Sequence, residues 1–194
     1  MRLGVYGGSF DPPHNGHLAL CLLAREKLGL DRLVISVSKN PFKSLPAASD
    51  EHRRRMTMLL ADELNRTSEF AEVTDWELGR PGPSYTIDLL LHLRSRHRED
   101  ELVLLVGEDS YNEMPRWKSS DEIPAHCTIS VFRRRDASGT GELSCGGQPP
   151  AICVDFDMPV SATEVRGLLR QGKSAGDLLP ESIARYIRAN NLYS

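Results

Sequence analysis

Short apolar runs alternate along the chain with longer segments in which apolar residues recur every three or four positions. The short runs indicate β-strands, and the longer segments indicate amphipathic helices. The unbroken apolar run at 101–107 indicates a strand that is buried on both faces. The predicted strands are residues 3–6, 33–38, 72–78, 101–107, 128–132 and 151–156, and the predicted helices are residues 17–29, 51–64, 85–98, 161–170 and 180–190.

This alternation predicts an α/β fold: a doubly wound, mostly parallel, Rossmann-like sheet with helices on both faces. The length of 194 residues favours a single domain, residues 1–194, whose helical C-terminal end begins at about residue 161. Parallel sheets of this kind bind ligands at the carboxyl ends of their strands. The loops that follow residues 6, 38, 106 and 156 are therefore expected to gather at one edge of the sheet.

Local signals refine several of these elements. Asp50 is suited to cap the helix that follows it, and the sequence Ser161-Ala-Thr-Glu164 has the form of a capping box. The basic run Arg53–Arg55 is interpreted as a solvated helix face. The Gly/Ser-rich segment 137–150 has the composition of a mobile surface loop.

Composition and charge exclude some classes of function. The hydrophobic fraction of 40% and the charged fraction of 26% are ordinary for a globular protein, and the net charge of −3 provides no basic field for long nucleic acids. We expect no membrane partner either, because no apolar stretch is long enough to span a bilayer and the start of the chain lacks signal-peptide features. The four cysteines lack CxxC or zinc-site spacing, so we expect reduced thiols, no bound structural metal and a cytoplasmic location. The oligomeric state stays open, a homo-oligomer included.

The stretch GVYGGSFDPPHNGHLAL carries the first candidate chemistry. Gly7 and Gly8 follow the first predicted strand, where positive φ angles and close approach of a ligand are expected. A helix N-terminus comes next, and it attracts anions. His14 and His17 lie three residues apart on one side of its first turn, with Gly16 keeping that surface low. The pattern favours a polyphosphate site over a pair of capping or surface histidines, and zinc would need a third ligand.

The motif GGSFDPPHNGH resembles the G-x-F-D-P-x-H-x-G-H signature of the HIGH-type nucleotidyltransferase superfamily. Further segments are similar in order and spacing to the bacterial nicotinate-nucleotide adenylyltransferases, and the resemblance covers nearly the whole chain. It implies transfer of the adenylyl group of ATP to nicotinate mononucleotide, giving deamido-NAD and pyrophosphate, with Mg²⁺ bound together with ATP. The segments are DWEL, PSYTIDLL, LLVGEDS, Trp117, VSATEVR and LPESIARYIRANNLY.

On the ATP side, the resemblance implies that His14 and His17 are catalytic and contact the phosphates. It implies a second phosphate clamp in SATEVR, where Ala162 replaces the usual serine, and a ribose contact from Asp109. It also implies a nucleotide contact from one of the arginines 133–135, of which we select Arg134. The implied ATP-binding residues are Gly7, Gly8, Ser9, Phe10, His14, His17, Gly107, Asp109, Arg134, Ser161, Thr163 and Arg166.

On the acceptor side, the resemblance implies that the helix start at Thr86 binds the nicotinate carboxylate and that Trp117 stacks on the pyridine ring. Trp117 as a core or rim aromatic is the alternative. Phe42 stands where the family has histidine. Asp75 and Glu77 are expected to point the same way from an extended segment, as site or surface carboxylates. The implied acceptor-binding residues are Asp11, Lys43, Ser84, Tyr85, Thr86 and Trp117.

Two other functions remain open at this point. A phosphopantetheine adenylyltransferase shares the first motif, but its chains are typically shorter and it has no reason to carry DWEL and SYT. A nucleotide-binding module without catalysis is the alternative from a different class. The intact pair of histidines and the intact second clamp disfavour it.

Overall fold

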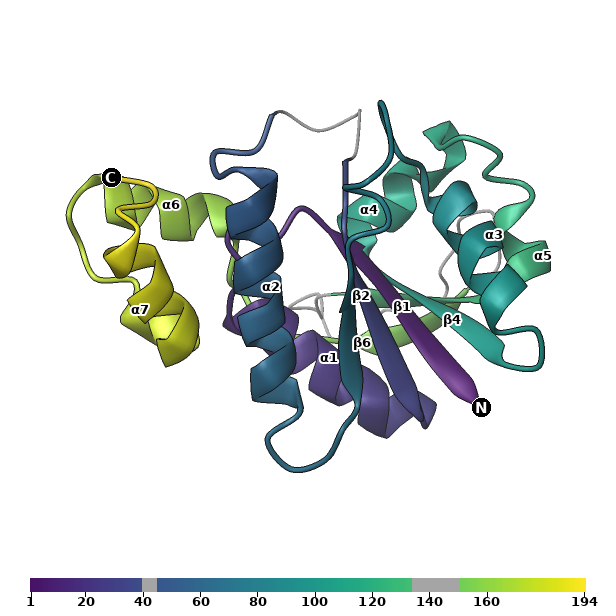
Figure 1. The fold of residues 1–194 in the computed structure, drawn as a ribbon. Helices are drawn as coiled ribbons and strands as arrows, with labels where there is room; N and C mark the ends of the chain where they lie inside the picture. The colour runs from purple at the N-terminus through teal and green to yellow at the C-terminus, as the bar shows by residue number, and fades with distance from the viewer. Residues whose placement is uncertain (40–44, 134–150) are drawn as a thin grey trace.

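A computed structural model of the chain describes residues 1–39, 45–133 and 151–194 (Figure 1). Within that part, six strands form one sheet with the order β3-β2-β1-β4-β5-β6, and every neighbouring pair is parallel. The prediction of a doubly wound sheet is confirmed. The strands are β1 (Arg2–Gly8), β2 (Arg32–Val37), β3 (Ala71–Thr74), β4 (Glu101–Gly107), β5 (Thr128–Arg133) and β6 (Ile152–Asp155).

Helices cover both faces of the sheet, as Figure 1 shows. Helices α1 and α2 cover one face, with α6 and α7 packed beyond them, while α3, α4 and α5 cover the other. The helices are α1 (Asn15–Leu28), α2 (Asp50–Leu64), α3 (Thr86–Arg96), α4 (Glu108–Glu113), α5 (Ile123–His126), α6 (Ala162–Arg170) and α7 (Glu181–Ala189), with short 3₁₀ turns η1 (Met114–Arg116) and η2 (Gly176–Leu178).

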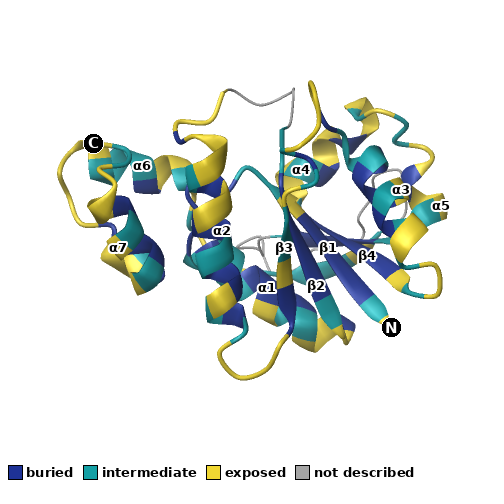
Figure 2. Cartoon of the chain, in the orientation of Figure 1, coloured by how far each residue is buried: buried dark blue, intermediate teal, exposed yellow. Residues whose placement is uncertain are grey.

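Alternation along the central strands divides the core into two layers. On β4, Val103 and Leu105 pack with α1 and α2, whereas Leu102, Leu104 and Val106 pack with α3 and α5. Successive side chains of a strand point to opposite faces, so both faces of β4 need apolar residues. The dark blue of the central strands in Figure 2 shows the result, which explains the unbroken apolar run in the sequence.

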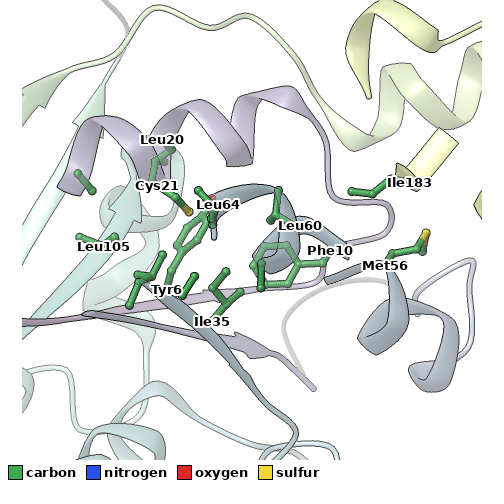
Figure 3. Close-up of a cluster of buried hydrophobic side chains, with 14 of the residues drawn as sticks. Tyr6, Phe10, Leu20, Cys21, Ile35, Met56, Leu60, Leu64, Leu105 and Ile183 are labelled. Atoms are coloured by element: carbon green, nitrogen blue, oxygen red, sulfur yellow. The ribbon is translucent and has the colours of Figure 1, made fainter. Parts of the chain in front are cut away.

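One core layer reaches from the sheet to the C-terminal helices. Phe10, in the loop after β1, lies in this layer with Met56 of α2 and Ile183 of α7, and all three side chains are at most 1% exposed (Figure 3). Burial of three such side chains contributes roughly 1.5–3 kcal/mol each. The loop after β1 is therefore anchored by the same contacts that hold the C-terminal helices.

The order of strands reverses direction between β1 and β4. The chain moves outward from β1 to β2 and β3, returns to β4 on the other side of β1, and then moves outward again to β5 and β6. Adjacent loops at such a point run to opposite faces and leave a crevice at the carboxyl ends of the strands. The loops after β1 and β4 flank this crevice.

Three local expectations are wrong. The strand predicted at 72–78 ends at Thr74 and is followed by a turn. Asp75 and Glu77 therefore do not point the same way: Asp75 pairs with Arg54 on the surface and Glu77 is buried.

The cap of α2 is Ser49 and not Asp50, and the hydroxyl of Ser49 accepts from the His52 amide. Apolar periodicity shows an element's existence better than its ends.

The basic run Arg53–Arg55 is not a uniformly solvated face. Arg53 is 1% exposed, and its guanidinium donates to the carbonyls of Ser9 and Ser38 and to the carboxylate of Asp50. These bonds satisfy a buried charge. They also tie the loops after β1 and β2 to α2.

The expectation of four reduced cysteines is also wrong. Cys153 takes part in a disulfide bond, whereas Cys21 and Cys127 are free and buried. The spacing of cysteines in a sequence does not show which of them meet in the fold. Within the described ranges, no helix is long and apolar enough to cross a membrane.

Candidate active site

A pocket of about 840 Å³ opens at the carboxyl ends of the strands, at the reversal between β1 and β4. Each predicted site residue that the structure describes lines this pocket. Lys43, Arg134 and the segment 137–150 lie outside the described residues. The residues brought together are Gly7, Gly8, Ser9, Phe10, Asp11, His14, His17, Ser84, Tyr85, Thr86, Gly107, Asp109, Trp117, Ser161, Thr163 and Arg166.

The positive φ angles expected at the two glycines at the end of β1 are absent. Both belong to the strand, and the residue with a positive φ is Phe10, at 48°. A Cβ atom on Gly8 would lie 2.9 Å from the Phe10 ring, so Gly8 makes room for that buried side chain. A Cβ atom on Gly7 would meet nothing within 4 Å. Gly7 thus leaves open space where a ligand can approach the backbone.

His14 and His17 form a close pair at the start of α1. His14 is the N-cap, and its backbone N–H donates to Nδ1 of His17 at 3.1 Å. The two ring centroids lie 3.8 Å apart. Because Nδ1 of His17 accepts, its neutral ring carries the proton on Nε2, which is then a donor. The amides of the first turn add further donors and the positive end of the helix dipole.

His14 is a buried base whose ring has an unused polar atom. Its side chain is 7% exposed, and Nδ1 has no hydrogen-bond partner among the described residues. Burial lowers the pKa of His14 to about 4, so the ring is neutral near pH 7 in the unliganded protein. An anion beside the ring would favour the protonated form and raise this pKa. The ring is therefore suited to meet negative charge that arrives or develops in the pocket.

The buried His14 predicts a specific dependence of stability on pH. An unfolded histidine titrates near 6.5, so the unfolded chain takes up this proton first. The stabilisation is present above pH 6.5 and is lost as the pH falls towards 4, by up to about 3 kcal/mol. Urea unfolding of the wild type and His14→Gln at pH 7.5 and 4.5 checks this: the variant should lose less free energy of unfolding between the two pH values. Equal losses would contradict the assignment.

The segment SATEVR forms the opposite wall beside the histidines. The hydroxyl of Ser161 accepts from the Glu164 amide, which confirms the expected cap of α6. Arg166 lies one turn further on, where it donates to the Thr163 hydroxyl at 3.2 Å and to the Asp11 carbonyl at 2.6 Å. Its guanidinium has five N–H donors, so others remain for an anion. A helix start, two hydroxyls and one fixed cation thus face the same space.

The third wall is the start of α3. Tyr85 is the N-cap, Thr86 is the first helical residue, and Ser84 beneath them is 3% exposed. Amides of a first helical turn lack partners within the helix and attract a carboxylate or phosphate. Lys118 lies 4.9 Å from the centroid of the Tyr85 ring and adds a cation at the rim. Trp117, partly buried beside this wall, lines the pocket, and its indole is of the kind on which an aromatic ligand can stack.

The carboxylate of Asp11 is directed at the protein itself. Its two oxygens accept from the amides of Ala47 and Ala48, at 2.7 and 3.0 Å, and Oδ1 also accepts from the Tyr193 hydroxyl at 2.7 Å. These bonds join the loop after β1 to the segment before α2 and to the segment after α7. They give Asp11 a supporting position in the pocket wall.

Sequence reasoning missed the burial of Glu77. This carboxylate lines the pocket, is 4% exposed and accepts from the Ser36 hydroxyl at 2.6 Å. Burial raises its pKa, and the bond from Ser36 and the charge of Arg53 act in the opposite direction. Glu77 belongs to the DWEL motif, but the turn after β3 that directs its side chain inward cannot be predicted from the spacing of apolar residues. Among the described residues, no group of three or more His, Cys, Asp and Glu is placed to hold a metal ion.

Sequence comparison places the whole chain among known proteins. The profile of the cytidylyltransferase-like family matches residues 5–168. A protein of Chlorobaculum tepidum named "probable nicotinate-nucleotide adenylyltransferase" is 57% identical over 194 residues, which cover all of both chains. A protein of Chlorobaculum parvum with the same name is 52% identical and matches all of this chain and 99% of its own.

Solved structures share the fold at lower identity. Nicotinic acid mononucleotide adenylyltransferase of Plasmodium falciparum complexed with APC superposes with a TM-score of 0.77 and 19% identity, covering 99% of this chain and 96% of that one. The same protein complexed with NaAD gives 0.76 and 20%, covering 99% and 97%. These structures show the same fold, whereas the sequence matches show the family to which the chain belongs. The chain belongs to the cytidylyltransferase-like nucleotidyltransferases, in the nicotinate-nucleotide adenylyltransferase family.

Proposed function

We propose that the chain transfers the adenylyl group of ATP to nicotinate mononucleotide, which gives deamido-NAD and pyrophosphate. One observation carries the proposal: the histidine pair and Arg166 share a pocket with the start of α3, so cationic and donor groups for two anionic nucleotides face one space. The names of the close relatives, and the complexes of the structural neighbour with APC and NaAD, support the same reaction.

The chemistry requires no protein nucleophile. The second pKa of a phosphate monoester is about 6, so the phosphate of nicotinate mononucleotide is already largely ionised near pH 7. It attacks the α-phosphorus of ATP, a new P–O bond forms, and the bond to the β-phosphate breaks with release of pyrophosphate. Catalysis then depends on alignment of the two phosphates and on neutralisation of the leaving group.

Each wall of the pocket has a distinct part in this reaction. His14 and His17 donate to the phosphates of ATP. The imidazole of His14 stabilises the negative charge that develops on the leaving group. Ser161, Thr163 and Arg166 hold the departing pyrophosphate. Mg²⁺ enters as part of the substrate, bound to the triphosphate, and adds charge neutralisation there.

The acceptor lies on the side of α3. The first amides of that helix, with the hydroxyl of Thr86, bind the nicotinate carboxylate, and Trp117 stacks on the ring. A negative carboxylate gains from a helix N-terminus, whereas the neutral amide of nicotinamide mononucleotide does not. The acid is therefore expected to be the better acceptor.

Measurement of pyrophosphate release with ATP and separate acceptors tests the proposal. Nicotinate mononucleotide should react fastest, nicotinamide mononucleotide more slowly, and phosphopantetheine not at all. Release with phosphopantetheine alone would replace the proposal with the other adenylyltransferase. Binding of ATP without release for any acceptor would favour a module that only binds nucleotides.

Replacement of Thr86 tests the acceptor wall. Thr86→Ala is expected to raise the KM for nicotinate mononucleotide about 10- to 100-fold, because a hydrogen bond to a charged group is lost. The KM for ATP should stay within two-fold. Thr128→Ala, at the amino end of β5, is a matched control that should change neither value. An equal rise for both substrates would contradict this placement of the acceptor.

A further inference from the structure

The segment after α7 returns to the pocket wall and touches it at one point. There Tyr193 donates its hydroxyl proton to Oδ1 of Asp11, at 2.7 Å. Burial and the neighbouring Asp11 raise the pKa of Tyr193 far above its usual range, so the hydroxyl stays a donor across the whole working pH range. The ring packs against the core layer that contains Phe10. The contact links residues 182 positions apart.

Tyr193 is held in a backbone conformation that bulky residues avoid. Its φ is 65°, and Asn191 two residues earlier has a φ of 48°. A left-handed conformation at a side chain of this size is rare, and it persists only where surrounding contacts fix it. The turn at 191–193 aims the phenol at Asp11.

Asp11 also contacts the second phosphate clamp, through Arg166. Its carbonyl oxygen accepts from Nη1 of Arg166 at 2.6 Å, and the same Nη1 lies 3.9 Å from Oδ2 of its carboxylate. The guanidinium therefore has two competing acceptors on one residue. The Tyr193 hydroxyl and the amides of Ala47 and Ala48 supply three donors to the carboxylate, and Arg166, which lines the pocket, bonds to the carbonyl instead.

We infer that Tyr193 is a positioning residue for adenylyl transfer: its hydroxyl is one of three donors to the Asp11 carboxylate and helps to keep the Arg166 guanidinium on the Asp11 carbonyl, at the wall of the pocket. The inference rests on the proposed function for its kinetic consequence. Without the hydroxyl, the guanidinium moves the short distance to the carboxylate and binds phosphate less well. The acceptor wall at α3 has no part in this contact.

The variant Tyr193→Phe removes the hydroxyl and keeps the ring that packs in the core. We expect kcat/KM for ATP to fall roughly 10-fold, mostly through a higher KM, since a hydrogen bond to a charged acceptor is lost. The KM for nicotinate mononucleotide should change less than two-fold. All assays are run at 10 °C, with far-UV circular dichroism to verify that each variant is folded.

Tyr186→Phe is the matched control. Tyr186 lies on α7 and its hydroxyl makes a hydrogen bond of 2.8 Å with Nδ1 of His52, away from the pocket. This variant loses a bond of similar length between a phenol and a partly buried partner. It should leave both KM values and kcat within two-fold of the wild type.

A double-mutant cycle separates positioning from a general loosening of the fold. In an Arg166→Ala background, Tyr193→Phe should change the affinity for a non-hydrolysable ATP analogue less than two-fold, because the group it acts through is absent. In the Arg166 background the same change should weaken binding roughly 10-fold. Calorimetric titration measures both.

Three results would overturn the inference: wild-type kinetics for Tyr193→Phe, an equal effect of the Tyr186→Phe control, or equal losses in both Arg166 backgrounds. Failure of the proposed function gives a different pattern. In that case the wild type releases no pyrophosphate with nicotinate mononucleotide, while the binding cycle with the ATP analogue still reports on Tyr193.

Discussion

Replacement of His14 by alanine is expected to lower kcat by about 10²- to 10³-fold, the usual loss when a preorganised donor to developing charge is removed. The effect should fall on kcat more than on the KM for ATP, because the charge on the leaving pyrophosphate is greatest in the transition state. Steady-state pyrophosphate release at saturating ATP measures it. The melting temperature should change little, since loss of an unsatisfied buried nitrogen offsets part of the lost packing.

His126→Ala is the control for this experiment. His126 ends α5 and is not among the residues that line the pocket, so its loss should leave kcat unchanged. Near-normal turnover of folded His14→Ala would show that the buried imidazole only fills space at the start of α1.

Removal of the clamp cation is expected to have the second largest effect. Arg166→Ala should lower kcat/KM for ATP by about 10²-fold or more, because a charge-assisted contact to phosphate is worth several kcal/mol in a partly desolvated site. Arg166→Lys should recover only a fraction of the loss, since an ammonium group cannot bond to the Asp11 carbonyl and to phosphate through one planar fork. Initial rates over a series of ATP concentrations provide both comparisons.

The control here is Arg185→Ala. Arg185 lies on α7, is exposed and pairs only loosely with Glu181, at 3.9 Å. Its loss removes the same unit of charge from the protein without touching the pocket. An equal fall in both variants would mean that net charge, and not the clamp, governs ATP use.

The parts of the site that could be predicted from sequence are those encoded by residues close together in the chain. His14 and His17 share one helical turn, and Ser161, Thr163 and Arg166 lie within the first two turns of another helix, so local spacing describes each group. The alternation of strands and helices predicted the doubly wound sheet and the edge at which the loops meet. The family resemblance, and not spacing, implied the acceptor residues and the role of the second clamp.

The parts that could not be predicted depend on contacts between distant segments. Arg53 was predicted to be solvated because its neighbours are charged. Its side chain is buried, and it donates to two carbonyls from other loops. Glu77 turns inward only because β3 ends early. The bond between Asp11 and Tyr193 joins opposite ends of the chain, and no local pattern marks the two residues as partners. Hydrophobic periodicity contains no information about such polar pairings.

Gly16 illustrates how one absent side chain can constrain a family of sequences. It sits in the first turn of α1 with an ordinary φ, so backbone freedom does not explain it. A methyl group there would lie 2.9 Å from Nδ1 of His14 and 3.0 Å from its Cε1. Because both contacts are shorter than ordinary van der Waals distances, even alanine would displace the ring. Divergent descendants of this chain can vary much of the surrounding loop, but any lineage that retains the first histidine is obliged to retain the glycine two positions later.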